Sequence, residues 1–173
     1  MSTRCQILFQ EIHLGKDEKT GKEETWNFEA QIYRHSDGYP EGGVLDDPEE
    51  FFDWNEDRND DVSYTAANFI YYMKRDMERY ILQYSKEKNP NYKSKDGKSY
   101  VQVGYGVEKA DHHIHGDEEY LYRITVQDDR RPDFKGWKIE VASVGYGDGA
   151  SFDNANYTKV YELTKGADIR KIN

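Results

Sequence analysis

A chain of 173 residues has the length of a single domain, which would span residues 1–173. A domain of this size can bury enough surface to fold without disulfide or metal cross-links. Its net charge of −10 argues against long nucleic acids and membranes as partners, although a few arginines in a pocket could still hold a small anionic ligand. The single cysteine and the lack of an apolar leader or a membrane-spanning run predict a cytoplasmic protein in a reducing compartment.

Two strands are expected first, at residues 4–13 and 25–33, with a polar turn between them. The second run alternates strictly between apolar and polar residues, which is typical of a half-buried strand. Its apolar face carries Trp26, Phe28, Ala30 and Ile32. Two such runs in succession predict a hairpin.

Residues 46–61 form an acidic segment with nine acidic side chains and one basic side chain, Arg58. Phe51, Phe52 and Trp54 lie within it, so we expect a solvated short helix and loop that these rings hold against the body of the protein. The alternative is an acidic face that binds a basic partner or divalent cations.

The clearest helix is expected at residues 63–86, where apolar residues recur at spacings of three and four. Asp61 or Ser63 can cap its start, and Asn89-Pro90 ends it. The apolar stripe predicts a helix that covers one face of a sheet. The members of the stripe are Ala66, Phe69, Ile70, Met73, Met77, Tyr80, Ile81 and Tyr84.

After a polar linker at residues 89–99, three strands are expected at residues 100–108, 119–127 and 136–144, with a weaker edge strand at 157–163. The sum is an α+β fold. It comprises a mainly antiparallel sheet of five or six strands with one long helix packed on it, in the order β-β-α-β-β-β(-β).

The densest chemistry lies at residues 33–43, where turn-forming glycines and a proline display polar side chains. Arg34 can grip a phosphate or carboxylate, and Tyr39 offers a stacking face. His35 can donate, accept or ligate, with Asp37 to orient it. The alternative is a plain turn that Arg34 and Asp37 hold together as an ion pair.

A second polar loop, at residues 111–117, concentrates three of the five histidines between two expected strands. His113, His115 and Asp117 have the residue types of a transition-metal site. A structural zinc site would usually recruit cysteines, which this chain lacks, so no metal is the favoured interpretation. His112 and His113 are expected to face solvent.

The strand that follows would place Glu119, Leu121 and Arg123 on one face, adding a carboxylate and an arginine to a groove. The alternative is a strand with core tyrosines. No known catalytic spacing is present, and Cys5 is expected to be a core residue rather than a nucleophile.

Two blocks of the sequence resemble a family of small, largely uncharacterised proteins from bacteria and their phages. The first is Y-R-H-S-D-G-Y-P-E-G at residues 33–42, preceded by residues 2–5, and the second is I-H-G-D-x-E-Y-L-Y at residues 114–122, preceded by residues 104–108. Residues 66–70 between them are also similar to the family. The resemblance implies that the chain is a member of this family and that it acts in the cytoplasm of a bacterial or infected host cell. It does not imply any particular activity.

If both polar loops lie at the same end of the sheet, their side chains could converge. The expected ligand-binding residues are Arg34, His35, Asp37, Tyr39, His115, Asp117, Glu119 and Arg123. We therefore expect a small-ligand-binding protein that sequesters a phosphorylated or nucleotide-like immune signal. One alternative is a small metal-dependent hydrolase with His35 as general base. The other is an acidic inhibitor that docks a host protein through residues 46–61.

Overall fold

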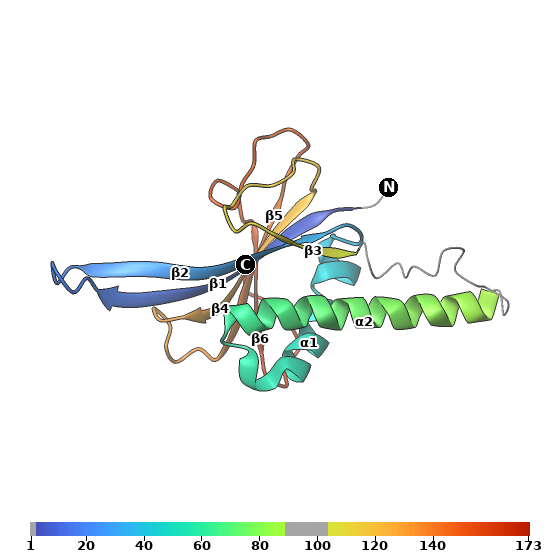
Figure 1. Ribbon diagram of the computed structural model, residues 1–173, viewed down its shortest axis with the longest axis horizontal. Coiled ribbons are helices and arrows are strands. Elements are labelled where there is room, and N and C mark those ends of the chain that lie inside the picture. The colour runs from blue at the N-terminus through green and yellow to red at the C-terminus, as the bar shows by residue number, and fades with distance from the viewer. Residues whose placement is uncertain (1–2, 89–103) are drawn as a thin grey trace.

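The computed structural model describes residues 3–88 and 104–173 (Figure 1). In chain order the elements are β1 (Cys5–Lys16), β2 (Glu23–Arg34), α1 (Asp47–Asn55), a 3-10 turn (Glu56–Arg58), α2 (Val62–Lys88), β3 (Tyr105–Glu108), β4 (Tyr120–Asp128), β5 (Gly136–Ser143), β6 (Lys159–Thr164) and β7 (Arg170–Lys171). The α+β class is confirmed.

The strands among these residues form one seven-stranded sheet in the order β3-β2-β1-β4-β5-β6-β7. The expected five or six strands were too few, and β6 is not the edge, because β7 pairs with it. β7 spans only two residues, which is too short to show an alternating pattern. The central strands β1 and β4 run parallel, whereas the other neighbouring pairs described are antiparallel.

One side of the sheet, which we call the helix face, is covered by α1 and α2 (Figure 1). Aromatic rings fill the layer between them. The ring centroid of Phe69 in α2 lies 5.4 Å from that of Phe9 in β1 and 5.2 Å from that of Phe51 in α1. Phe51 and Phe52 are buried, so the expected short helix held by its aromatic residues is confirmed, while Trp54 stays 43% exposed.

The start of α2 is capped by Asp61, whose Oδ1 accepts hydrogen bonds from the backbone N–H groups of Ser63 at 3.1 Å and Tyr64 at 3.2 Å. Ala66, Phe69 and Met73 of the expected stripe are buried. No helix among the described residues is long and apolar enough to cross a membrane.

Some of the predicted features lie outside the residues and side chains that the structure describes. This holds for the side chains of Met77, Tyr80, Ile81 and Tyr84, for the helix stop at Asn89-Pro90, for the linker at 89–99 and for the strand start at 100–103.

The opposite side of the sheet, which we call the loop face, is covered by residues 109–119 and 144–158. Its apolar cluster is small and centres on Leu8, Leu121, Ala142 and Phe152. Beside it lie buried polar side chains, such as the pair in which Gln10 donates to Thr125 Oγ1 at 2.7 Å. This face therefore combines a thin apolar layer with buried hydrogen-bonding groups.

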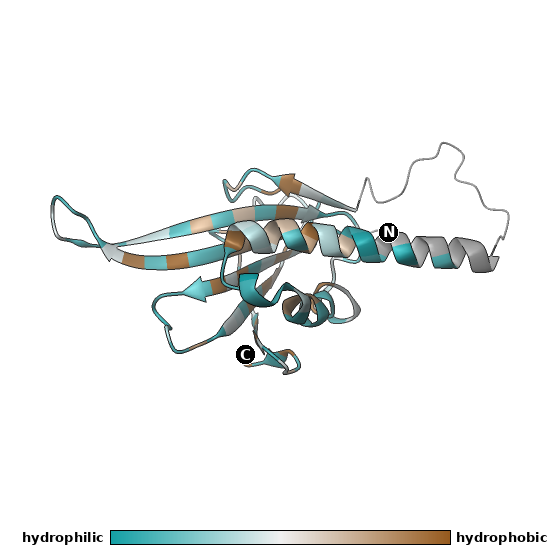
Figure 2. Ribbon diagram, turned by 60° about the horizontal axis from the view of Figure 1, so that its bottom comes forward, coloured by the Kyte–Doolittle hydropathy of each residue, from teal (hydrophilic) through white to brown (hydrophobic). Residues whose placement is uncertain are grey.

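The outer halves of β1 and β2 project beyond the body as a two-stranded arm that carries several hydrophobic positions (Figures 1 and 2). Ile32 is 1% exposed, but Trp26 is 45% and Phe28 is 56% exposed. The expected burial of that whole strand face is thus wrong for the arm. α2 begins at Val62, whose N–H donates to Glu11, and so does not extend over the arm.

Candidate functional site

The two polar loops lie at the same end of the sheet. Cys5 pairs with Arg34, the last residue of β2, and with Tyr120, the first residue of β4. Gly38 N–H donates to Thr3 O, and Glu119 N–H donates to Arg4 O, each at 3.0 Å. The start of β1 therefore lies between the loops, as the convergence hypothesis requires.

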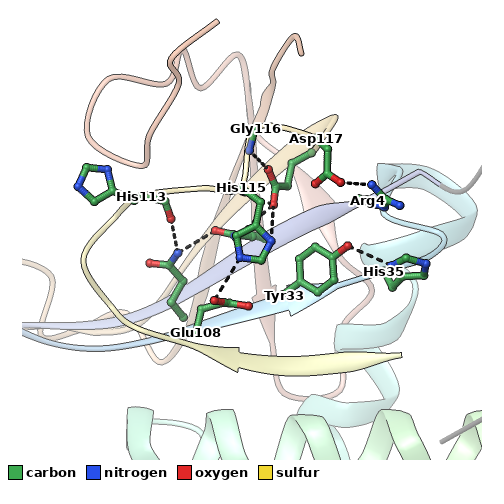
Figure 3. A network of polar contacts seen from close by, with 11 residues as sticks. Arg4, Tyr33, His35, Glu108, His113, His115, Gly116 and Asp117 are labelled. Atoms are coloured by element: carbon green, nitrogen blue, oxygen red, sulfur yellow. Dashed lines mark hydrogen bonds and ion pairs between the residues drawn. The ribbon is translucent and has the colours of Figure 1, made fainter. Parts of the chain in front are cut away.

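We use the name two-loop site for the side chains that meet there. They are Arg4, Tyr33, His35, Glu108, His115, Asp117 and Glu118 (Figure 3).

Neighbouring residues of the first loop point to opposite faces of the sheet. Arg34 is buried on the helix face, where it forms an ion pair with Asp47 and lies 5.4 Å from the Tyr105 ring centroid. Its Nε also donates to Ser36 O at 2.7 Å. The partner of Arg34 is Asp47 rather than Asp37, and Arg34 holds β2, the first loop and α1 together.

Tyr33 lies on the loop face and links the two histidine loops. Its hydroxyl is 3.1 Å from His35 Nδ1, and its ring centroid is 5.1 Å from that of His115 (Figure 3). Burial raises the pKa of Tyr33 above that of an ordinary phenol, against the lowering effect of the nearby Arg4 guanidinium. Tyr33 thus brings together histidines from both loops.

The remaining residues of the first loop shape the turn. Asp37 has a φ of 55°, which an aspartate tolerates, and its Oδ1 accepts a hydrogen bond from Tyr39 at 3.4 Å. A Cβ on Gly38 would lie 2.8 Å from the carbonyl carbon of Arg4. Only glycine permits the loop to approach the start of β1 this closely.

The second loop is held by its own buried carboxylate, Glu118. Glu118 Oε2 accepts from Gly116 N–H at 2.8 Å, and Oε1 accepts from His115 N–H at 3.3 Å and from Gln6 Nε2 at 3.2 Å. Gln31 Nε2 extends the network by donating at 2.7 Å to Gln6 Oε1 and to the carbonyl of His113. The network fixes the loop to both β1 and β2.

His115 lies between two carboxylates. Its Nε2 is 3.3 Å from Glu108 Oε2, and its Nδ1 is 3.7 Å from Glu118 Oε1 (Figure 3). Asp117 forms an ion pair with Arg4 through Oδ2, whereas its buried Oδ1 has no partner among the described residues. One potential ligand atom from each of His115, Asp117 and Glu118 lies within 4.8 Å of the others.

The other two histidines of the second loop behave differently. His113 is exposed, as expected, and its ring points away from the cluster (Figure 3), so Glu118 takes its place in the candidate metal set. The expected exposure of His112 is wrong. Its Nδ1 lies 2.6 Å from Asp153 and its Nε2 lies 2.8 Å from Glu29, so it joins three segments.

Arg123 and Glu119 also stay outside the two-loop site, as do Arg34, Asp37 and Tyr39 of the first loop. Arg123 forms an ion pair with Glu140 at 3.0 Å and lies 4.1 Å from the Tyr157 ring centroid. Glu119 is exposed, and among the described residues only its backbone makes hydrogen bonds. Cys5 is fully buried, and burial raises its pKa to about 12, so it is a core residue as expected.

Sequence reasoning missed Arg4, Glu108 and Glu118 as members of the site, and it included Tyr33 in the first loop without giving it a role. Arg4 and Glu108 sit at strand ends, and only the strand order brings them together. Glu118 carried a local signal, because a carboxylate two residues after a histidine–glycine pair can accept both N–H groups of the turn.

Comparison with known proteins gave no matching family model, no matching curated protein and no matching solved structure. Membership of the family that the two sequence blocks resemble therefore stays a prediction.

Proposed function

We propose that this chain binds a phosphorylated or nucleotide-like small molecule through a divalent cation at the two-loop site. The observation that carries the proposal is the cluster of His115, Asp117 and Glu118, whose ligand atoms lie within 4.8 Å of one another. Such a set of one imidazole and two carboxylates suits Zn²⁺ or Mn²⁺.

The orientation of His115 supports a metal ligand. Metal-binding histidines usually donate their second ring N–H to a carboxylate, which fixes the tautomer and the direction of the ring. Glu108 lies at that position, 3.3 Å from Nε2, and Nδ1 is left on the side of Glu118. The Gln6 side chain and the Gly116 N–H donate hydrogen bonds to Glu118 and fix the direction of this second proposed metal ligand in the same way.

The local charge also favours a cation. Glu108, Asp117 and Glu118 bring three carboxylates together, while Arg4 is the guanidinium paired with Asp117. Three carboxylates against one guanidinium leave this group with an excess of negative charge, which a divalent cation would offset. Asp117 Oδ1, which has no partner within the described part of the chain, offers a lone pair without breaking the ion pair with Arg4.

Three protein ligands leave coordination positions open, and a phosphate oxygen can fill them. Arg4, with 33% of its side chain exposed beside Asp117, supplies a fixed positive charge next to the cation. A cation with an adjacent arginine is well suited to a phosphate. The imidazole of His115, 49% exposed, can contact a base.

Calorimetry with nucleoside phosphates and cyclic oligonucleotides tests the proposal, with one arm in Mn²⁺ and one in EDTA. We expect binding in the Mn²⁺ arm that weakens at least tenfold in Arg4→Gln. Flat isotherms in both arms would contradict ligand binding, and equal binding in both arms would contradict the role of the cation.

The open position could instead hold a water molecule that the cation activates, which would make the protein a small metal-dependent hydrolase. The same three-ligand set favours this second candidate. Incubation of the Mn²⁺-loaded protein with the ligands that bind separates the two, because a hydrolase releases product over time and a binding protein returns the ligand intact.

A further inference from the structure

A cleft of about 510 Å³ lies at the far end of the sheet from the two-loop site. It opens between the acidic segment and the turn that joins β4 to β5. Phe52, Phe134 and Trp137 form apolar parts of its wall, and Asp57, Asp60 and Asp129 are among the residues that line it. Its volume is within the range of pockets that bind ligands or side chains of a partner.

The lining of the cleft is acidic. Five carboxylates line it against three lysine or arginine side chains. Lys165 is held by Glu56 and Arg131 by Glu162, while the side chains of Asp57 and Asp60 have no ion pair or hydrogen bond within residues 3–88 and 104–173. Unpaired carboxylates beside aromatic rings attract a guanidinium or ammonium group.

The exposed aromatic residues of the arm are connected to this cleft through His13. The His13 ring lies 6.0 Å from that of Trp26, in a stacked arrangement, and 5.4 Å from that of Phe28. Its Nδ1 is 3.3 Å from Asp129, which lines the cleft. His13 thus links the two exposed rings to the acidic cleft, and we call the rings, His13 and the lining of the cleft together the arm–cleft surface.

We propose that the arm–cleft surface docks a basic segment of a partner protein, with an arginine or lysine in the cleft and an apolar residue against Trp26 and Phe28. Both aromatic residues are about half exposed, and large exposed aromatic residues commonly anchor protein interfaces. The unpaired carboxylates select a basic partner. A second copy of this chain is disfavoured, because its net charge of −10 opposes self-association.

A displayed library of random 12-residue peptides, sorted on the full chain, tests this proposal. We expect the enriched peptides to be rich in arginine or lysine together with apolar residues. Their affinity should fall as NaCl is raised. It should also fall about tenfold or more in Trp26→Ala. Asp57→Asn and Asp60→Asn should each weaken binding at least threefold, whereas Glu119→Gln, which removes an exposed charge at the opposite end of the sheet, should not.

Circular dichroism and thermal melting of each variant establish that it is folded. The proposal is overturned if no peptide is enriched, if the enriched peptides lack an excess of positive charge, or if they bind Trp26→Ala and Asp57→Asn as tightly as the unchanged protein. It is also overturned if light scattering shows a dimer that Trp26→Ala abolishes, because the occupant would then be a second copy.

Discussion

Glu108 Oε2 lies 3.3 Å from His115 Nε2, so the last residue of β3 fixes the direction of an imidazole that the second loop contributes. In the proposed cation site this carboxylate would hold the His115 ring from behind, fixing its tautomer and its direction.

Replacing this carboxylate should weaken cation binding without unfolding the protein. Glu108→Gln is expected to lower the affinity for Zn²⁺ or Mn²⁺ about 10- to 100-fold, the usual cost of losing such a contact. Competition dialysis against a chelator measures the change. Glu119→Gln is the matched control, because that nearby carboxylate is exposed, and equal affinities in the two variants would contradict the role of Glu108.

Arg34 is expected to act on stability rather than on ligand binding. Arg34→Met leaves Asp47 without its buried partner and should lower the free energy of unfolding by about 3–5 kcal/mol. Urea denaturation followed by circular dichroism gives this value. The double variant Arg34→Met, Asp47→Asn should recover much of the loss. A stable Arg34→Met protein that has lost ligand affinity would show that Arg34 contacts the ligand.

The close approach of the first loop to β1 should make Gly38 intolerant of a side chain. A Cβ there would overlap the backbone of Arg4 and Cys5, so Gly38→Ala should cost about 1–3 kcal/mol of unfolding free energy. Gly106→Ala is the control, because nothing lies within 4 Å of its added Cβ, and it should change stability by less than about 0.5 kcal/mol. Similar denaturation midpoints would refute the packing described for Gly38.

His112 should make stability depend on pH. Both of its ring nitrogens face carboxylates, and a neutral imidazole has only one N–H to donate. Burial alone would lower the pKa of His112, but the hydrogen bonds with Glu29 and Asp153 outweigh it and raise the pKa.

The stabilisation from His112 is therefore complete below the unfolded-state pKa of about 6.5 and is lost as the pH rises through the higher folded-state pKa. Melting temperatures of the unchanged protein and of His112→Asn should differ most at acidic pH and converge at alkaline pH. Asparagine suits the φ of 65° at this position. If the melting temperatures of the two proteins differ by the same amount across the pH range, His112 does not stabilise the fold through its contacts with Glu29 and Asp153.

Much of the fold could be predicted because local patterns and tertiary packing agree. The alternation in β2 and the apolar stripe of α2 identified both elements, and the acidic segment was held by Phe51 and Phe52 as expected. The exposure of Trp26 was not predictable, because alternation shows that side chains share a face but not how far the neighbouring elements extend.

The site was predictable only where local residue types indicated it. Residue types identified both loops, and their meeting at one end of the sheet was a hypothesis that the parallel pairing of β1 with β4 fulfils. The role of Arg34 depended on which face its side chain takes and on which distant residue lies opposite, and neither is encoded within the first loop itself.

Metal analysis of untagged protein, dialysed against Zn²⁺ or Mn²⁺ and then against metal-free buffer, tests the central claim most directly. We expect one ion per chain in the unchanged protein and in His113→Ala, and none in His115→Ala. His113 is the matched control because it lies two positions away with its ring turned from the cluster (Figure 3). An unchanged protein without stoichiometric metal, or equal metal content in the two variants, would contradict the cation site.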